Sequence, residues 1–177
     1  GHRFDRQYGE LPFGYDHKYV YSHFGYNLKA TDMQAAVGCA QLEKFPSFAQ
    51  RRRHNFAYLR QALKNEGDKI ILPQACANSD PCWFGFLLTC KEGVSRNKVV
   101  SSIESAGIQT RMLFAGNLTR HPCFSQMKAS GKGYRVVGGL SNTDQVMNDS
   151  FWVGVYPGLT DEMLEDMARA IKNALRP

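Results

Sequence analysis

Two residues near the start of the chain, Asn27 and Lys29, have the types and spacing to bind an anion. They precede Thr31 and Gln34, whose T-x-x-Q spacing is that of a capping box, in which two side chains satisfy backbone N–H groups at a helix start. Asn27 and Lys29 are therefore expected on a loop that leads into a helix N-terminus, where free N–H groups and the helix dipole favour negative charge. The alternative is a polar loop in which Asn27 merely tolerates a left-handed backbone.

A second group of polar residues is associated with residues 108–114, a segment that is expected to form a strand. Arg111 lies near the end of this segment, and Asn117 lies in the loop after it. Side chains at a strand end and in the following loop commonly meet a ligand, so we expect Arg111 to supply charge and Asn117 hydrogen bonds. A surface salt bridge and a turn residue are the alternative. His121, in the same loop, has the chemistry of a general base, but no spacing suggests a partner carboxylate.

The remaining polar residues form no complete catalytic set. His17 and His23 lie six residues apart, whereas helical metal sites use closer pairs such as i and i+4. Five irregularly spaced cysteines without a C-x-x-C motif support neither a zinc ribbon nor a disulfide framework. Cys39, in a helical pattern, and Cys90, at the end of an apolar run, are expected to be small buried hydrophobes in a reducing cytoplasm.

Composition limits the class of protein further. The 177 residues suffice for one ordinary domain, and a hydrophobic content of 43% suffices for a packed core. No apolar run approaches the ~20 residues of a membrane span, and the chain opens with Gly1 and no secretory signal, which suggests a fragment, a processed chain or a tag remnant. The net charge is +6, with its densest cluster at residues 51–54. Four consecutive basic residues spread around a helix, which favours a solvated helix face over a nucleic-acid site.

Two helices are expected to form the backbone of the domain. The first spans residues 31–45, where apolar residues recur with helical spacing. Pro46 kinks or breaks it, and Ser47 with Gln50 makes a second capping box. The second helix then continues to Gly67, which suits a left-handed C-cap.

Strands and shorter helices alternate through the rest of the chain. Strands are predicted at residues 69–72, 83–89, 108–114 and 151–156, and helices at residues 95–106, 141–149 and 160–176. This order predicts an α+β fold, with a small, mainly antiparallel sheet on which helices pack. Residues 1–30 are too irregular to fold alone and are expected to form an N-terminal arm, whereas residues 31–177 form the domain.

Several segments resemble a known family. The Gly-Tyr-Asn run of residues 25–27, with Lys29 and the Gln-Ala-Ala run of residues 34–36, is similar to a signature of the sugar-nucleotide aminotransferases, fold-type I enzymes that use pyridoxal phosphate. Residues 107–111 resemble the strand before that family's substrate loop, and residues 152–159 resemble its closing strand and turn. The resemblance implies the fold of the C-terminal domain of a fold-type I aminotransferase.

Other segments are similar to a narrower branch, the CDP-4-keto-6-deoxyglucose 3-dehydratases of 3,6-dideoxyhexose and lipopolysaccharide O-antigen synthesis. These segments are residues 12–19, 80–86 and 113–120. Ordinary members of the family carry Tyr at the position of Phe114, and Pro-Pro and His at the positions of Ala115, Gly116 and Leu118. These departures favour the dehydratase branch over the aminotransferases.

The resemblance implies roles for five residues. Asn27 would donate its side-chain amide to the cofactor phosphate across the interface of a homodimer, and Lys29 would add positive charge nearby. Arg111, Phe114 and Asn117 would line the site of the sugar nucleotide. No catalytic residue and no metal ligand is expected within this chain.

The resemblance covers only the C-terminal part of such an enzyme. A large domain before Gly1 would bind pyridoxamine 5′-phosphate, with a histidine in place of the Schiff-base lysine, and would carry the cysteine ligands of a [2Fe-2S] cluster that receives electrons from a flavin-dependent reductase. The chain alone is then expected to be inactive. There are two alternatives: a fragment of a 4-keto-sugar aminotransferase and a stand-alone basic binding module. At the cofactor position of the full gene, Lys would indicate the aminotransferase and His the dehydratase.

Overall fold

The computed structural model describes residues 5–26 and 28–176. Its contacts divide the chain into two compact units, Gly1–Gln41 and Leu42–Pro177, and we call the second the sheet unit. In the first unit, the described residues before residue 32 form turns and the short 3-10 helix η1 (His17–Tyr19), whose N-cap Asp16 accepts a hydrogen bond from the backbone of Lys18. The expected division of the chain at residue 30 stays a prediction.

Helix α1 (Asp32–Ala62) begins at the predicted capping box. The backbone N–H of Thr31 donates to Gln34 Oε1 at 2.9 Å, and the backbone N–H of Gln34 donates to Thr31 Oγ1 at 3.3 Å. This reciprocal pair satisfies two N–H groups that the helix itself leaves unpaired. The sequence therefore located this helix start correctly.

The predicted break at Pro46 is wrong, because α1 continues through it. Proline removes one backbone donor, which a long helix tolerates at the cost of a single i to i−4 hydrogen bond. The second capping box is also absent: the hydroxyl of Ser47 donates to the carbonyl oxygen of Lys44 at 2.7 Å, one turn earlier. Gly67 has φ −66° and does not form the predicted left-handed cap.

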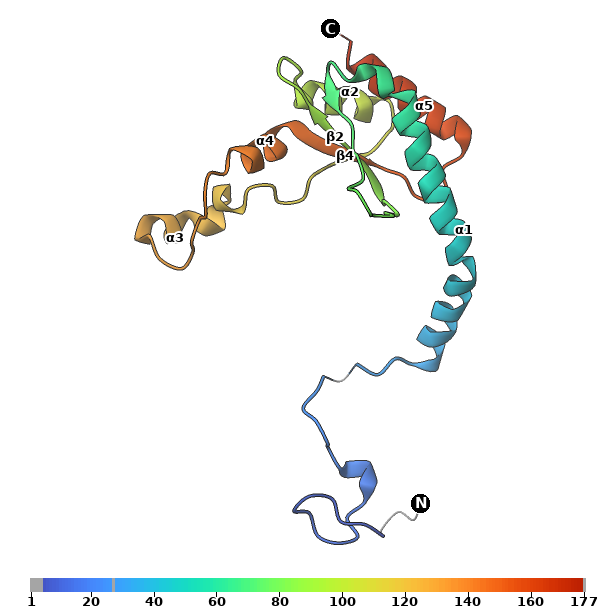
Figure 1. Cartoon of the computed structure of the whole chain (residues 1–177), viewed down its shortest axis with the longest axis vertical. Helices are drawn as coiled ribbons and strands as arrows, with labels where there is room; N and C mark the ends of the chain where they lie inside the picture. Colours follow the sequence, from blue (N-terminus) through green and yellow to red (C-terminus); the bar gives the residue numbers. More distant parts are fainter. Residues whose placement is uncertain (1–4, 27, 177) are drawn as a thin grey trace. The chain divides into compact units, whose positions relative to one another are not determined.

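Four strands form one antiparallel sheet in the order β1-β2-β4-β3. The strands are β1 (Ile70–Ile71), β2 (Gly85–Cys90), β3 (Thr110–Met112) and β4 (Ser150–Gly154). In the centre, Phe86 pairs with Val153 and Leu88 with Phe151. The predicted α+β architecture with an antiparallel sheet is confirmed, and Figure 1 shows β2 and β4 at its middle.

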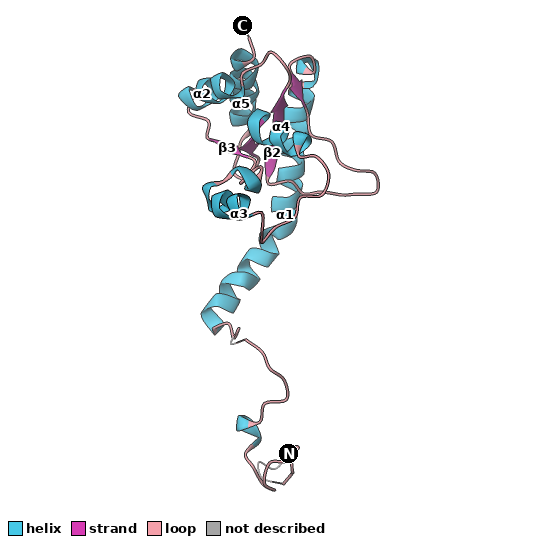
Figure 2. Cartoon of the chain, turned by 90° about the vertical axis from the view of Figure 1, so that its left-hand side faces the viewer, coloured by secondary structure: helices cyan, strands magenta, loops and turns pink. Residues whose placement is uncertain are grey.

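Helices cover the sheet unequally. The helices after α1 are η2 (Lys64–Glu66), α2 (Arg96–Ser105), η3 (Leu118–Arg120), η4 (Pro122–Phe124), α3 (Ser125–Ser130), α4 (Ser141–Asp149) and α5 (Asp161–Ala174). Within the sheet unit, Figures 1 and 2 show α2 and α5 on one side of the sheet and α4 on the other. The segment between β3 and β4 carries α3 away from the strands.

The hydrophobic core lies between one sheet face and α2, α5 and the end of α1. Phe86, Leu88, Phe151 and Val153 are fully buried on this face. Burying each such side chain contributes about 1.5–3 kcal/mol, so this layer holds the sheet unit together. The opposite face is more open: Leu87 and Trp152 are half-buried.

The two cysteines predicted to be buried differ. Cys90 is buried at the end of β2, and burial, with a smaller contribution from Asp149, raises the pKa of its thiol to about 11. Such a thiol stays protonated and inert at neutral pH. Cys39 is exposed, so the prediction for it is wrong; Met33 and Val37 on the same helix are also 79% and 63% exposed.

Across residues 5–26 and 28–176, no helix combines the length and the apolar character that a bilayer crossing requires.

Candidate functional site

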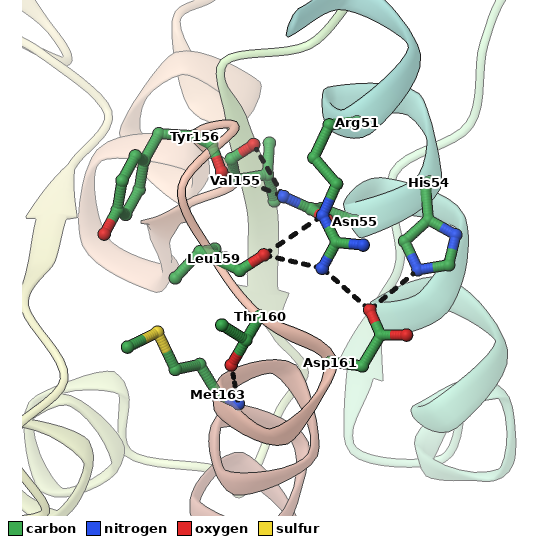
Figure 3. A network of polar contacts seen from close by, with 9 residues as sticks. All are labelled: Arg51, His54, Asn55, Val155, Tyr156, Leu159, Thr160, Asp161 and Met163. Carbon is green, nitrogen blue, oxygen red and sulfur yellow. Dashed lines mark hydrogen bonds and ion pairs between the residues drawn. The ribbon is translucent and has the colours of Figure 1, made fainter. Parts of the chain in front are cut away.

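A polar network fixes the turn between β4 and α5 against α1 (Figure 3). Arg51 donates to the carbonyl oxygen of Leu159 through Nε at 3.0 Å and Nη2 at 2.6 Å, and its Nη2 also lies 2.7 Å from Asp161 Oδ1. His54 Nε2 lies 3.1 Å from the same carboxylate oxygen. Arg53 Nη2 lies 2.8 Å from Asp80 Oδ2, so three members of the basic cluster are engaged within the chain, which argues against a nucleic-acid site there.

Asn55 completes this network from inside the core. It is fully buried, and its Nδ2 donates to the carbonyl oxygens of Tyr156, at 2.9 Å, and Val155, at 3.4 Å. Its Oδ1 has no partner among the described residues. Sequence reasoning missed this residue, although Asn55, Leu59 and Leu63 follow each other at the i, i+4 spacing of one helix face.

Arg111 and Phe114 belong to a cluster of rings on the open sheet face. The guanidinium carbon of Arg111 lies 5.7 Å from the ring centroid of Trp152. The ring of Phe84 meets Trp152 edge-on at 5.2 Å, and Phe114 lies 6.5 Å from Phe84 at a 50° tilt. The indole N–H of Trp152 donates to the carbonyl oxygen of Met112 at 3.2 Å, which fixes the orientation of its ring.

The loop after β3 has an unusual backbone. Phe114 has φ +49°, although it is not glycine, and its side chain is 73% exposed. A left-handed conformation costs a residue with a Cβ about 1–2 kcal/mol. Two residues later, Gly116 has φ +58°, and a Cβ at this position would approach the Met147 side chain to 2.5 Å. Only glycine fits at Gly116, which keeps this loop close against α4.

Asn117 is buried beneath this loop, with 2% of its surface exposed. Its Nδ2 donates to Asp144 Oδ1 at 2.6 Å, and its Oδ1 accepts from the backbone N–H of Thr119 at 3.1 Å and from the hydroxyl of Thr119 at 2.7 Å. Arg120 binds Asp144 through Nε, at 3.1 Å, and Nη2, at 2.5 Å. The carboxylate of Asp144 therefore ties the loop to α4 at two points.

The hydrogen bonds of Asp144 with Asn117 and Arg120, which we call the clamp, predict a pH dependence of stability. The hydrogen bonds from Arg120 first, and from Asn117 second, hold the pKa of Asp144 below its ordinary value. A depressed pKa stabilises the fold above the unfolded pKa of about 3.9, and this contribution is lost as the pH falls through the lower folded pKa. In urea titrations, the difference in unfolding free energy between the native protein and Asp144→Asn should therefore shrink as the pH falls from about 6 to about 2. Arg120→Gln should show the same trend, and a constant difference for both variants contradicts the clamp.

The predicted site residues divide into separate groups. Arg111 and Phe114 share the ring cluster, and Asn117 lies in the clamp beside them. Lys29 is exposed and belongs to the first unit. Asn27 lies outside the described residues. Two members of the ring cluster, Phe84 and Trp152, were not predicted as site residues.

Lys29 provides an exposed positive charge close to the start of α1. Among the described residues, its ammonium group has no hydrogen bond or ion pair, and it stands two positions before Thr31, the N-cap of α1. A free cation near a helix N-terminus complements negative charge. In the described part of the chain, no three His, Cys, Asp or Glu side chains gather as a metal centre requires.

Comparison with known proteins identifies the family of this chain. Residues 6–172 match the DegT/DnrJ/EryC1/StrS aminotransferase family. The chain belongs to this family. The proteins to which it is similar include sugar-nucleotide enzymes, in keeping with the family resemblance of its sequence segments.

Three relatives illustrate the place of the chain within the DegT/DnrJ/EryC1/StrS family. It is 55% identical over 167 residues to the lipopolysaccharide biosynthesis protein RfbH of Salmonella typhimurium, covering 93% of this chain and 37% of RfbH. It is 47% identical over 171 residues to the dTDP-4-dehydro-2,6-dideoxy-D-glucose 3-dehydratase of Saccharopolyspora spinosa, covering 96% and 36%. The structure of Escherichia coli GDP-4-keto-6-deoxy-D-mannose-3-dehydratase with bound hydrated PLP shares the fold, with a TM-score of 0.72 and 24% identity over 87% of this chain and 38% of that one. The chain thus spans little more than a third of each relative.

Proposed function

We propose that this chain is the C-terminal part of a pyridoxamine phosphate-dependent dehydratase that removes the C3 hydroxyl of CDP-4-keto-6-deoxyglucose, in the synthesis of 3,6-dideoxyhexoses for lipopolysaccharide. The observation that carries the proposal is the 47% identity to a sugar-nucleotide 3-dehydratase over 96% of the chain. The 55% identity to a lipopolysaccharide biosynthesis protein supports the pathway. The CDP-linked substrate rests on the similarity of residues 12–19, 80–86 and 113–120 to that branch.

Within this proposal, Arg111 and Phe114 contact the sugar nucleotide directly. Both side chains are exposed on the open sheet face, and the guanidinium group of Arg111 has no hydrogen bond or ion pair among the described residues. Asn117 serves the same site by shaping the loop, since its side chain is buried and bonded to Asp144 and Thr119.

Asn27 and Lys29 hold the cofactor phosphate across the interface of a homodimer in this proposal. The exposed apolar side chains of Met33 and Val37 on α1 suit a surface that another subunit or the rest of the protein covers. When bound, the cofactor supplies the electron sink that lets the C3 hydroxyl leave. A [2Fe-2S] cluster with ligands outside this chain, a flavin-dependent reductase and a cytoplasmic location complete the proposal, and the chain alone is inactive.

The reaction is tested with the full-length protein and a 4-keto sugar nucleotide. Loss of the C3 hydroxyl in the presence of pyridoxamine phosphate and a reducing system supports the dehydratase. Formation of an amino sugar, with glutamate as the amino donor, instead supports the aminotransferase alternative. This alternative is tested because the family is described as an aminotransferase family.

The role of Arg111 gives a direct prediction. Arg111→Ala in the full-length enzyme should lower kcat/KM for the sugar nucleotide by about tenfold or more, because a hydrogen bond to a charged group contributes about 1.5–3 kcal/mol. Arg60→Ala, which removes an exposed arginine on α1, is the matched control and should leave kcat/KM unchanged. Native kinetics in a folded Arg111→Ala enzyme would reject the contact.

A further inference from the structure

The open face of the sheet carries a row of side chains that the core does not use. Trp152 pairs in register with Leu87 on β2 and with Arg111 on β3, so these three residues cross the sheet side by side. Beyond them lie Phe84 and Phe114, which are 54% and 73% exposed. Adjacent exposed aromatic rings on a sheet face are typical of a surface that binds a ligand or another protein surface.

Trp152 lies at the centre of this row, and contacts on two sides hold its ring. Its ring lies against Gly85, where an added Cβ would come within 2.5 Å of the indole, so glycine is required under it. Its N–H is held by the carbonyl oxygen of Met112. Arg111 and Phe84 both contact this ring, and the hydrogen bond of its indole N–H helps to hold it in place for them.

Phe114 is presented to solvent at an energetic cost. Its left-handed backbone is unfavourable, and strain of this kind persists only where the surroundings enforce it, typically at functional sites. The surroundings here are the clamp of Asp144 on Asn117 and Arg120, and the contact of His121 Nε2 with the carbonyl oxygen of Ala115 at 2.6 Å. The ring gains little burial from this arrangement, so packing within the chain does not explain the strained backbone. A ligand that contacts the exposed ring would explain it.

The row, in which we include Phe84 and Phe114, combines flat apolar rings with the positive charge of Arg111. The planar guanidinium group of Arg111 suits a phosphate, which it can bind with two parallel hydrogen bonds. The rings of Phe84 and Phe114 suit the face of a heteroaromatic base, which stacks on an aromatic side chain. A ligand that needs both is a nucleoside diphosphate.

We propose that Phe114 and Phe84 stack on the base of the sugar nucleotide, that Arg111 binds its diphosphate, and that Trp152 positions them. This assignment rests on the proposed function and specifies which half of the substrate the sheet unit holds. The relatives named above act on dTDP-linked and GDP-linked sugars by their names. Because every base has a π-face, stacking tolerates such differences. The row therefore contributes affinity for the nucleotide and leaves the choice of base to other contacts.

Calorimetric titration of the full-length protein with CDP, dTDP, GDP and inorganic pyrophosphate tests this assignment without requiring turnover. Phe114→Ala should weaken all three nucleotides by roughly five- to a hundredfold, the size of one lost base stack, and leave pyrophosphate binding unchanged. Arg111→Ala should weaken the nucleotides and pyrophosphate alike. Phe114→Tyr, which keeps a ring, should bind as the native protein does, and so should Val137→Ala, a control that truncates another exposed residue between β3 and β4.

Other outcomes reject the inference, the proposed function or both. Native affinity of Phe114→Ala for all three nucleotides shows that no base stacks there, and if its dimer then dissociates in sedimentation experiments, the row is a protein interface. Weakening of a single nucleotide assigns Phe114 to base choice. Equal loss of pyrophosphate binding by Phe114→Ala shows a disordered site. A native protein that binds the nucleotides as predicted but leaves the 4-keto sugar unchanged rejects only the proposed function, whereas a native protein that binds no nucleoside diphosphate rejects both.

Discussion

Replacing Asn55 with aspartate is expected to destabilise the sheet unit by about 3–5 kcal/mol at neutral pH, the usual cost of an uncompensated buried charge. Asn55 is fully buried, and its amide donates to the carbonyl oxygens of Val155 and Tyr156. A carboxylate at this position would place negative charge against two carbonyl oxygens, where the native side chain presents two N–H donors. Urea denaturation of the native and variant proteins at pH 7 measures the loss.

The pH profile distinguishes charge from lost packing. Burial should raise the pKa of the introduced carboxyl group above its unfolded value of about 3.9. Below that pH the group is protonated in both states and the penalty is small; as the pH rises, ionisation favours the unfolded chain and the penalty grows. Asn55→Leu, which is apolar and of similar size, should be destabilised by a smaller amount that does not vary with pH. Equal profiles for the two variants contradict the role of Asn55 as a donor.

Replacing Asn27 with alanine in the full-length protein is expected to raise the dissociation constant for pyridoxamine phosphate by roughly ten- to a hundredfold, since a hydrogen bond to a charged group contributes about 1.5–3 kcal/mol. The expectation comes from the position of Asn27 in the Gly-Tyr-Asn segment before α1 and from the family resemblance. The fold should survive, because the capping pair of Thr31 and Gln34 is untouched. Absorbance titration of the apoprotein with the cofactor gives the constant.

A mixed dimer tests whether Asn27 acts across the subunit interface. One subunit carries Asn27→Ala, and the other carries a defect in the phosphate ligands of its own large domain. If the amide serves the neighbouring site, both defects fall on the same site and each mixed dimer keeps one sound site. Impairment of both sites, or native cofactor affinity of Asn27→Ala itself, contradicts the cross-subunit role.

Local patterns in the sequence predicted much of the fold. The capping box at Thr31 depends on residues close together in the chain, and the structure has it. The predictions at Pro46 and Ser47 were wrong because each residue is compatible with two local structures, a helix end and a continuous helix. The helix accepted the loss of one donor, and the serine hydroxyl bonded back to Lys44. Local signals alone do not decide between such options.

The site depends more on distant pairing. Arg111 appeared in the sequence as a residue near a strand end, but its contact with Trp152 follows from the register of β3 against β4, which residue types do not specify. The partner of Asn117 is Asp144, on a helix beyond a glycine-rich loop. Asn55 did leave a local signal, as a polar residue on the same helix face as Leu59 and Leu63.

The connection between β3 and β4, residues 113–149, can change in length without disturbing the sheet. Its two ends are anchored on neighbouring antiparallel strands, while α3 and the glycine-rich loop extend beyond the sheet. Doubling the length of a flexible connection costs only about 0.6 kcal/mol in closure entropy. Insertions and deletions here can therefore reshape the surface around Phe114 from one relative to the next, while the pairing of β3 with β4 and the ring of Trp152 on Gly85 stay as they are.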